Sequence, residues 1–249
     1  MEGQDGLNRL FFELASESRL GILQELQKNE FRMQEIARRL RLTDTEVCRQ
    51  LQRLSDARLI QKQPDGHYRL TTYARLILDA SLQMGFINRN MEYFLDHDAY
   101  QLPSEFCARF GELSSATLIR STVETLNWVC QMFKNAEKKI DAVVVGLETM
   151  LDMELQRLNE GLKVRWIVYE SYLPKAKLKL QSLERLPEMR STLNIHGHVG
   201  VTDKAAVLTI KRNDGTWSYD AFVGEDPSFH KFAQDLFNYE WEKAKPWHP

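Results

Sequence analysis

The segment between residues 38 and 69 concentrates side chains of the types that contact nucleic acid. Arginine and lysine bind phosphates, and arginine and glutamine form paired hydrogen bonds with guanine and adenine. Residues 32–75 carry ten basic and five acidic side chains, although the whole chain has a net charge of −2. This local excess predicts a polyanion-binding surface confined to one segment. The side chains that we expect to contact DNA are Arg38, Arg39, Arg41, Thr43, Thr45, Arg49, Gln50, Arg53, Lys62, His67 and Arg69.

A second group with the spacing of a chemical motif lies in the segment IHGHVGVTD, where His196, His198 and Asp203 form the pattern HxHx4D. Phospholipase D enzymes use HxKx4D, in which the histidine attacks phosphorus and the lysine holds the phosphate. Histidine stands at the lysine position here, and a neutral imidazole is a poor substitute for a permanent cation near pH 7. A phosphodiesterase or nuclease guided to DNA is therefore our second hypothesis.

A metal site is another interpretation of the same motif, since His196 and His198 would lie on one face of a strand. Asp203 is an odd step away, and no fourth ligand is evident. We favour a degenerate motif that lines an effector pocket, and we expect no catalytic residue, metal ion or cofactor. Two aromatic residues on predicted strands, Trp166 and Tyr169, are assigned to this pocket with the motif, although packing in the core is the alternative for both.

Helical and strand periodicities place the basic residues on a compact set of elements. Apolar residues of MQEIARRL recur at i, i+3, i+4 and i+7, which predicts a helix over residues 33–40. An earlier helix is expected from Ser16 to about Leu26. Two short strands, Leu59–Gln63 and His67–Thr71, flank a Pro-Asp-Gly turn and predict a β-hairpin.

A further helix is expected to begin at Thr43. The sequence TDTE places a hydroxyl at the N-cap and a carboxylate three residues later, which is the pattern of a capping box. Val47, Leu51 and Leu54 would form the inner face of this helix. The remaining side chains, including Gln50, are then expected to face outward or to the flank.

The order helix, helix, turn, helix and hairpin indicates a winged helix-turn-helix. The segments LASESRLGILQEL, MQEIARRLRLTDTEVCRQLQRLSDARLIQK and YRLTTYARLIL resemble the winged-helix domains of ArsR-type prokaryotic transcription regulators. One departure is Ala74, where that family often has glycine. The resemblance implies a DNA-binding regulator whose helix from Thr43 enters the major groove. A winged helix used for protein contact is a third hypothesis.

A heptad seam follows the hairpin, over a predicted helix of about 25 residues that begins at Thr72. We expect this helix to pair two winged domains into a homodimer, and a helix that packs only on its own chain is the alternative. Pro103 marks the end of the segment. The seam residues are Tyr73, Ile77, Ala80, Met84, Ile87, Met91 and Phe94.

The second half of the chain has the pattern of an α/β domain. KIDAVVVGL and LKVRWIVYE are nearly unbroken apolar runs separated by a helical stretch, which is typical of a βαβ unit in a parallel or mixed sheet. Asn213-Asp214-Gly215 predicts a hairpin turn. The final segment, PSFHKFAQDLFNYEWEKA, predicts an amphipathic helix.

The same half resembles the C-terminal domain of archaeal winged-helix regulators of the methanogenesis type. The segments that carry this resemblance are NAEKKIDAVVVG, GLKVRWIVY, VTDKAAVLTIKRNDG and FAQDLFNYEWEKA. Those domains are distantly similar to the phospholipase D fold and to the sensor domains of TrmB-type sugar regulators. The resemblance implies a domain that senses a small-molecule effector or a partner.

The composition fits a globular protein, with 43% hydrophobic and 27% charged residues. No apolar run has the length of a transmembrane helix, the N-terminus lacks the pattern of a secretory signal, and three well-separated cysteines suit a reducing compartment. We therefore expect a cytoplasmic, two-domain regulator of α+β and α/β class without a membrane partner. Its expected parts are a winged helix over residues 1–72, a linking helix over 73–102 and an effector-sensing domain over 103–249.

Overall fold

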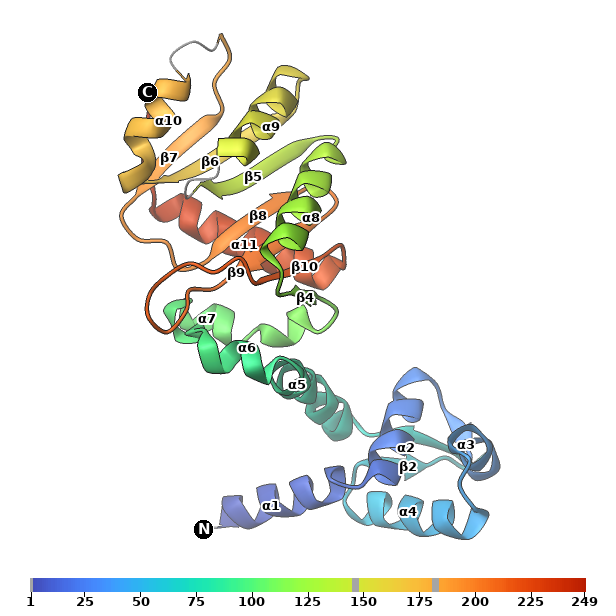
Figure 1. The fold of residues 1–249 in the computed structure, drawn as a ribbon. Helices are drawn as coiled ribbons and strands as arrows, with labels where there is room; N and C mark the ends of the chain where they lie inside the picture. Colours follow the sequence, from blue (N-terminus) through green and yellow to red (C-terminus); the bar gives the residue numbers. More distant parts are fainter. Residues whose placement is uncertain (1, 145–147, 181–183) are drawn as a thin grey trace. The chain divides into compact units, whose positions relative to one another are not determined.

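The computed structural model describes residues 2–144, 148–180 and 184–249 (Figure 1). The chain divides into an N-terminal unit of residues 1–81 and a C-terminal unit of residues 82–249. The expected combination of a winged helix-turn-helix with a mixed-sheet domain is confirmed. Within the described ranges, no helix is long and apolar enough to span a bilayer.

The N-terminal unit packs short helices on a small antiparallel sheet. Its helices are α1 (Glu2–Leu14), α2 (Glu17–Lys28), α3 (Met33–Leu40) and α4 (Asp44–Asp56). Its strands are β1 (Phe31–Arg32), β2 (Ile60–Lys62) and β3 (His67–Leu70), in the order β1-β3-β2. The buried aliphatic side chains that join these elements include Ile22, Leu23, Ile36, Val47, Leu51, Leu54, Leu59 and Leu70. The predicted helices and hairpin are therefore present.

The turn between α3 and α4 is fixed by local geometry. Arg41 adopts the left-handed conformation with φ of 55° and ends α3. The Leu42 N–H then donates to the Ala37 carbonyl at 3.0 Å. Thr43 caps α4, because its hydroxyl accepts a hydrogen bond from the Glu46 N–H at 3.2 Å. This cap holds the first turn of α4 in a defined position.

Helix α5 (Thr72–Arg89) ends earlier than the sequence predicts. The Asn90 side-chain amide donates to the Phe86 carbonyl at 2.9 Å, and α6 (Met91–Asp96) begins after this break. Phe86 and Tyr93 are buried in the core of the C-terminal unit. The prediction of one continuous linking helix is therefore wrong, because one side of the segment from residue 82 onward packs into that core.

The C-terminal unit contains an eight-stranded mixed sheet among its described residues, in the order β11-β7-β6-β5-β8-β9-β10-β4. Strands β5, β6 and β7 are parallel, and the other pairs are antiparallel. The predicted βαβ unit is thus confirmed. The strands are β4 (Thr117–Ile119), β5 (Lys139–Val144), β6 (Lys163–Tyr169), β7 (Glu188–Thr192), β8 (His198–Thr202), β9 (Ala206–Thr209), β10 (Ala221–Gly224) and β11 (Lys245–Pro246).

Helices cover both faces of this sheet (Figure 1). Helix α11 (Pro227–Lys243) packs on one face and is the predicted closing amphipathic helix. Helices α8 (Thr122–Lys134), α9 (Glu148–Asn159) and α10 (Leu173–Leu180) pack on the other face. The shorter helical turns are η1 (Ala99–Gln101), α7 (Ser104–Cys107), η2 (Phe110–Leu113) and η3 (Glu170–Tyr172). Each face of the sheet therefore has its own apolar core.

Candidate nucleic-acid interface

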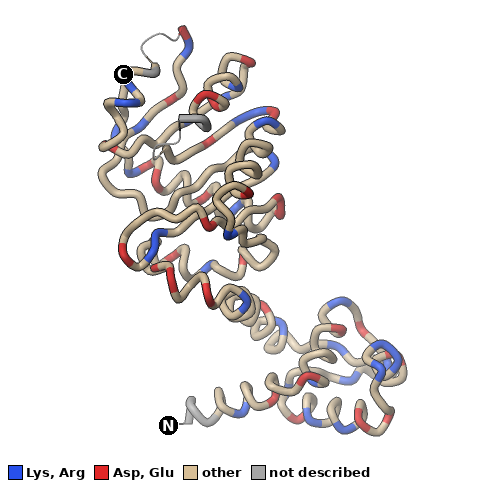
Figure 2. The backbone as a smooth tube through the Cα atoms, in the orientation of Figure 1, with Lys and Arg blue, Asp and Glu red and all other residues tan. Residues whose placement is uncertain are grey.

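Three exposed arginines form a cationic group around the turn between α3 and α4: Arg38 lies on α3, Arg41 directly follows it and Arg49 lies on α4. None of the three makes an ion pair within the part of the chain that the structure describes. Figure 2 shows Lys and Arg gathered around α3 in the N-terminal unit. An exposed cation that has no internal partner keeps its full charge for an external anion, so these three side chains are the strongest candidates for phosphate or base contact.

The first turns of α4 present small polar groups beside this arginine group. Thr43 and Thr45 are exposed, and Arg49 follows one turn later on the same helix. The Glu46 carboxylate accepts a hydrogen bond from the Ser18 hydroxyl at 2.9 Å, so it is held against α2. The outward surface of the first turns of α4 therefore includes hydroxyls and a guanidinium, which are groups that read base edges, beside the exposed Asp44 carboxylate and the Cys48 thiol.

The prediction that Gln50 faces outward is wrong. Gln50 is only 6% exposed, and its side-chain oxygen accepts a hydrogen bond from the Arg19 guanidinium at 3.3 Å. Gln50 shares the buried stripe of α4 with Val47, Leu51 and Leu54. A residue on this stripe packs against α2, so we exclude Gln50 from the interface.

Two further arginines are engaged within the N-terminal unit. The Arg53 guanidinium lies 2.8 Å from the Glu13 carboxylate, which also pairs with Arg19 at 2.9 Å. The Arg39 guanidinium lies 3.2 Å from Glu25 and stacks over the Phe31 ring. Because each is tied to an internal carboxylate, Arg39 and Arg53 are weaker candidates for phosphate contact than the arginine group above.

The wing offers one exposed cation and two side chains with internal partners. Lys62 on β2 is exposed. The His67 imidazole lies 3.0 Å from the Asp65 carboxylate, and Arg69 is half-buried beside Gln61. Hydrogen bonds from the backbone and side chain of His67 lower the pKa of Asp65, so this carboxylate stays ionised at the tip of the wing. Lys62 is therefore the wing residue best placed to reach a phosphate.

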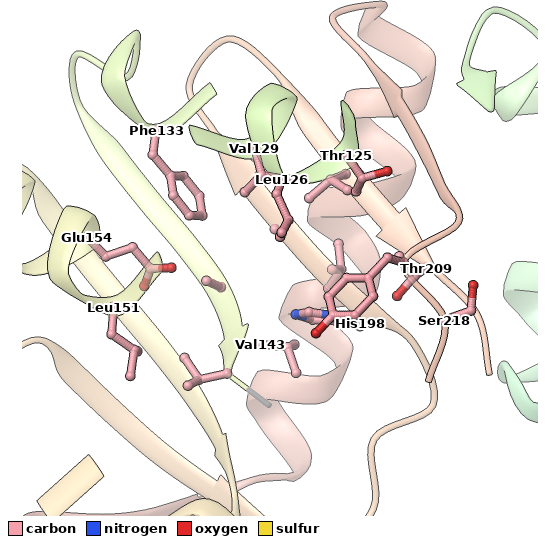
Figure 3. Close-up of a pocket in the computed structure, with 16 residues that line it drawn as sticks. Thr125, Leu126, Val129, Phe133, Val143, Leu151, Glu154, His198, Thr209 and Ser218 are labelled. Carbon is pink, nitrogen blue, oxygen red and sulfur yellow. The ribbon is translucent and has the colours of Figure 1, made fainter. Parts of the chain in front are cut away.

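The three residues of the HxHx4D motif do not converge on one site. His196 precedes β8, and its Nδ1 lies 2.8 Å from the Glu240 carboxylate on α11. His198 begins β8 and lines a cavity beneath α8 and α9, on the opposite face of the sheet (Figure 3). The prediction that both histidines share one face of a strand is therefore wrong, because the strand begins only at His198.

Asp203 has a structural partner of its own. Its Oδ1 accepts hydrogen bonds from the backbone N–H groups of Glu137 and Lys138, each at 3.0 Å. Although burial opposes ionisation, these backbone donors lower the pKa of Asp203. No set of three His, Cys, Asp or Glu side chains among the described residues could hold a metal ion. The motif therefore lacks the geometry of a phosphodiesterase centre or a metal site.

The cavity that contains His198 is lined by polar residues that the sequence analysis missed. Trp166 is buried in the core, and Tyr169 packs against the core on the α11 side, so neither lines it. Glu154 on α9 is 3% exposed and does line the cavity. Glu154 occupies a core position of its helix beside Leu151 and could have been detected by its place on that apolar stripe.

Comparison with known proteins identifies the N-terminal domain class. Residues 16–69 match the sequence model of the MarR family. The match coincides with the winged helix of the N-terminal unit, a fold that DNA-binding transcription regulators use, and does not extend over the rest of the chain. The ArsR-type resemblance is thus supported only at the level of a winged helix. No curated protein matches the chain.

Several solved structures have distantly similar folds. TrmBL2, an archaeal chromatin protein with a novel mode of DNA binding, is 14% identical, with 93% of this chain and 94% of that chain covered and a TM-score of 0.45. NucT from Helicobacter pylori is 12% identical, with 53% and 98% covered and a TM-score of 0.43. Nuc from Salmonella typhimurium, a phospholipase D family member, is 10% identical, with 50% and 91% covered and a TM-score of 0.41. Likeness at this level supports no conclusion about activity.

Proposed function

We propose that this chain is a homodimeric, sequence-specific transcription regulator that binds duplex DNA through its winged helix. The observation that carries this proposal is the exposed group Arg38, Arg41 and Arg49, whose charges have no partner in the described part of the chain. An isolated basic surface on a chain with net charge −2 has no evident structural role. Its location on a helix-turn-helix indicates a role in DNA binding, since phosphate contacts hold such a domain on the duplex.

The geometry of α4 divides these contacts by role. Thr43, Thr45 and Arg49 lie on the first turns of the helix, which enter the major groove in domains of this class. Arg38 and Arg41 lie on and directly after α3, where they would contact phosphates and fix the position of α4. Lys62 on the wing would add a backbone contact. TrmBL2 is described as a DNA-binding chromatin protein, and DNA is the partner that we propose here.

Replacing Arg49 with alanine is expected to weaken specific binding more than non-specific binding. Loss of a paired arginine–guanine contact costs about 1–3 kcal/mol of discrimination against the wrong base. The measurement is selection of bound duplexes from a random pool, followed by titration of the selected site and a scrambled site. Arg120→Ala, which removes an exposed arginine before α8 in the C-terminal unit, is the matched control. Equal loss of affinity for both duplexes would contradict a base-reading role for Arg49.

The proposed dimer uses the exposed apolar side chains of α5 and α6. Met84, Ile87 and Met91 belong to the heptad seam and are 56%, 38% and 52% exposed. Phe94, in contrast, stacks on Phe110 inside the C-terminal unit and does not contribute to a partner surface. Met84 and Ile87 lie on α5 and Met91 begins α6 after the break at Asn90, so the partner surface that we propose spans the ends of two helices. A second copy of this chain is the partner that also provides a two-fold axis for a pseudo-palindromic DNA site.

The double substitution Met84→Glu/Met91→Glu is expected to convert the dimer into a monomer. Carboxylates on both sides of a two-fold apolar interface lose hydration and repel one another. Light scattering after size exclusion measures the change as a halving of the mass. Leu178→Glu/Leu193→Glu changes two other exposed apolar residues, 73% and 64% exposed, and is the control. A wild-type monomer, or a dimer that survives the substitution, would rule out this interface.

The C-terminal unit would provide the signal that controls DNA binding. An effector can shift the regulator only if it binds one dimer geometry more tightly than the other. We do not propose the alternative of a phosphodiesterase or nuclease. His196 is engaged by Glu240, His198 lies on the other face of the sheet, and Asp203 accepts hydrogen bonds from the backbone.

A further inference from the structure

A cavity of about 70 Å³ lies inside the C-terminal unit, between the sheet and helices α8 and α9 (Figure 3). Most of its wall is apolar, with Leu126, Val129 and Phe133 from α8. Its size exceeds the roughly 30 Å³ that one water occupies in the liquid, so it can hold a small organic molecule of a few heavy atoms. Apolar cavities with a few converging polar groups are the usual sites for small ligands.

Polar groups face this cavity from two sides. Glu154 approaches from α9, and Thr125, Thr209 and Ser218 gather at the opposite end (Figure 3). Glu154 belongs to α9, Thr125 belongs to α8 and Thr209 belongs to β9, so the polar groups reach the cavity from separate elements. His198 on β8 lies between them. A ligand that satisfies both ends therefore needs a polar group at each of its own ends.

Two of these hydroxyls have no internal partner. Thr125 and Thr209 are 4% and 5% exposed, and neither Oγ1 atom has a hydrogen-bond partner among the described residues. Glu154 is 3% exposed, and no ion pair in the described ranges joins it to a cation. Buried polar atoms of this kind destabilise a fold, so a group of three around one cavity indicates a site that a ligand completes.

The charges around the cavity restrict the ligand class. Among the described residues, the lining contains a carboxyl group and hydroxyls but no lysine or arginine. An anionic ligand would lose its hydration here without gaining a cationic partner from the described lining. A ligand with an ammonium group would pair with Glu154, and a ligand hydroxyl would hydrogen-bond to the threonines. We propose that this cavity binds a short amino alcohol, with its ammonium group on Glu154 and its hydroxyl on Thr125 and Thr209.

The protonation of Glu154 gives this proposal a specific signature. Burial raises the pKa of Glu154 to about 8, against the opposing effect of the Trp166 indole N–H. The other titratable side chains on the described part of the cavity wall are Tyr219 and His198. Burial lowers the pKa of His198 to about 4, so this imidazole is neutral. An ammonium ligand must therefore displace the Glu154 proton. Binding is expected to release about one proton, and affinity should rise up to about tenfold per pH unit below pH 8.

The test is calorimetric titration of the full chain with four probes of nearly equal size: ethanolamine, ethylamine, ethylene glycol and glycolate. We expect ethanolamine to bind with a Kd in the millimolar range or tighter and to bind more tightly than the other three probes. Glu154→Gln should weaken the binding of ethanolamine at least about 30-fold, because the buried counter-ion of its ammonium group is lost. Thr209→Val should lower the affinity for ethanolamine to the affinity for ethylamine, because the hydrogen bond to the ligand hydroxyl is lost. Glu160→Gln, at an exposed position directly after α9 where the carboxylate pairs with Arg157, is the control.

The outcomes are decisive because the titration is independent of DNA. Tighter binding of glycolate or ethylene glycol, an unchanged affinity in Glu154→Gln, or no binding by folded wild type would overturn the proposal. This inference rests on the proposed function only where it makes the ligand the effector. Intact DNA binding without ethanolamine binding would contradict the ligand site and leave the proposed DNA-binding function standing. Ethanolamine binding by a chain that does not bind DNA would support the ligand site and contradict the proposed DNA-binding function.

Discussion

The double variant Arg38→Glu/Arg41→Glu is expected to bind duplex DNA on the order of 100-fold more weakly than wild type near physiological salt. Both guanidinium groups are exposed and make no ion pair in the described part of the N-terminal unit, so their charges are available to phosphates. Each phosphate contact releases condensed counterions, and reversal of the charge also adds repulsion. The loss should affect specific and scrambled duplexes alike, because phosphate contacts do not read sequence.

Fluorescence anisotropy at several salt concentrations measures this effect and its origin. The slope of log K against log salt should become shallower by about 1.8 when two phosphate contacts are lost. Lys175→Glu/Lys177→Glu on α10 makes the same change in net charge at exposed positions of the C-terminal unit. This control variant should retain the wild-type slope. An unchanged slope in the arginine variant, or an equal loss in the control, would show that α3 does not contact the phosphate backbone.

The sequence predicted the winged helix well because its elements are determined by local interactions. Thr43 caps α4 through a hydroxyl three residues from its donor. The Pro-Asp-Gly turn is closed by Gly66, whose φ of 89° is accessible to glycine at little cost. Such short-range rules need no knowledge of the rest of the fold. The same holds for the βαβ unit, in which apolar strands are separated by one helix.

The residues that were placed wrongly all depend on long-range packing. Gln50 follows the buried positions of α4, but its partner Arg19 lies 31 residues earlier in the chain. Helical spacing does place Gln50 on the apolar stripe. It was assigned to the DNA-facing side because a glutamine side chain can pair with adenine in the major groove. Phe94 also fits the heptad seam, yet its ring stacks on Phe110 of a later segment. Periodicity identifies a buried face without identifying what covers it.

The cavity was hidden for the same reason. Glu154 follows Leu151 and precedes Leu155 and Leu158 on the buried stripe of α9, so its position could be read from the sequence. Its surroundings could not, since they come from α8, β5, β8 and β9. The two histidines of the HxHx4D motif are a case in which the sequence predicted an orientation that the structure does not have. Their spacing suggested one face, but the start of β8 between them separates their directions.

The second large effect that we expect concerns stability. The free energy of unfolding of the wild type should decrease as pH rises above 6.5, and Glu154→Gln should abolish this decrease. Burial raises the pKa of Glu154 from 4.5 to about 8. Between these values the folded chain keeps a proton that the unfolded chain has lost, so the free energy of unfolding falls as pH rises. The fall is 1.36 kcal/mol per pH unit, or about 2 kcal/mol between pH 6.5 and 8.

Two buried histidines act in the opposite direction at the acid end of this window. Burial lowers the pKa of His198 to about 4 and also lowers the pKa of His97 from 6.5. The unfolded chain is still about half protonated at each of these positions near pH 6.5, so they make stability rise with pH until about pH 7.5. The contribution of Glu154 is therefore measured as the difference between wild type and the glutamine variant, and its sign is negative. The glutamine variant should show no decline there and should exceed wild type in stability at pH 8.

Urea unfolding followed by tryptophan fluorescence reports on the C-terminal unit, which contains Glu154. All five tryptophans of the chain lie after residue 82, at 128, 166, 217, 241 and 247, so the signal reports the C-terminal unit. Glu160→Gln removes an exposed carboxylate directly after α9 and should keep the wild-type dependence on pH. A decline of equal slope in Glu154→Gln would mean that the buried carboxyl group is already ionised, with a partner that neutralises it. An amino alcohol that pairs with Glu154 should in turn flatten the wild-type curve, because the bound ammonium stabilises the carboxylate in the folded state.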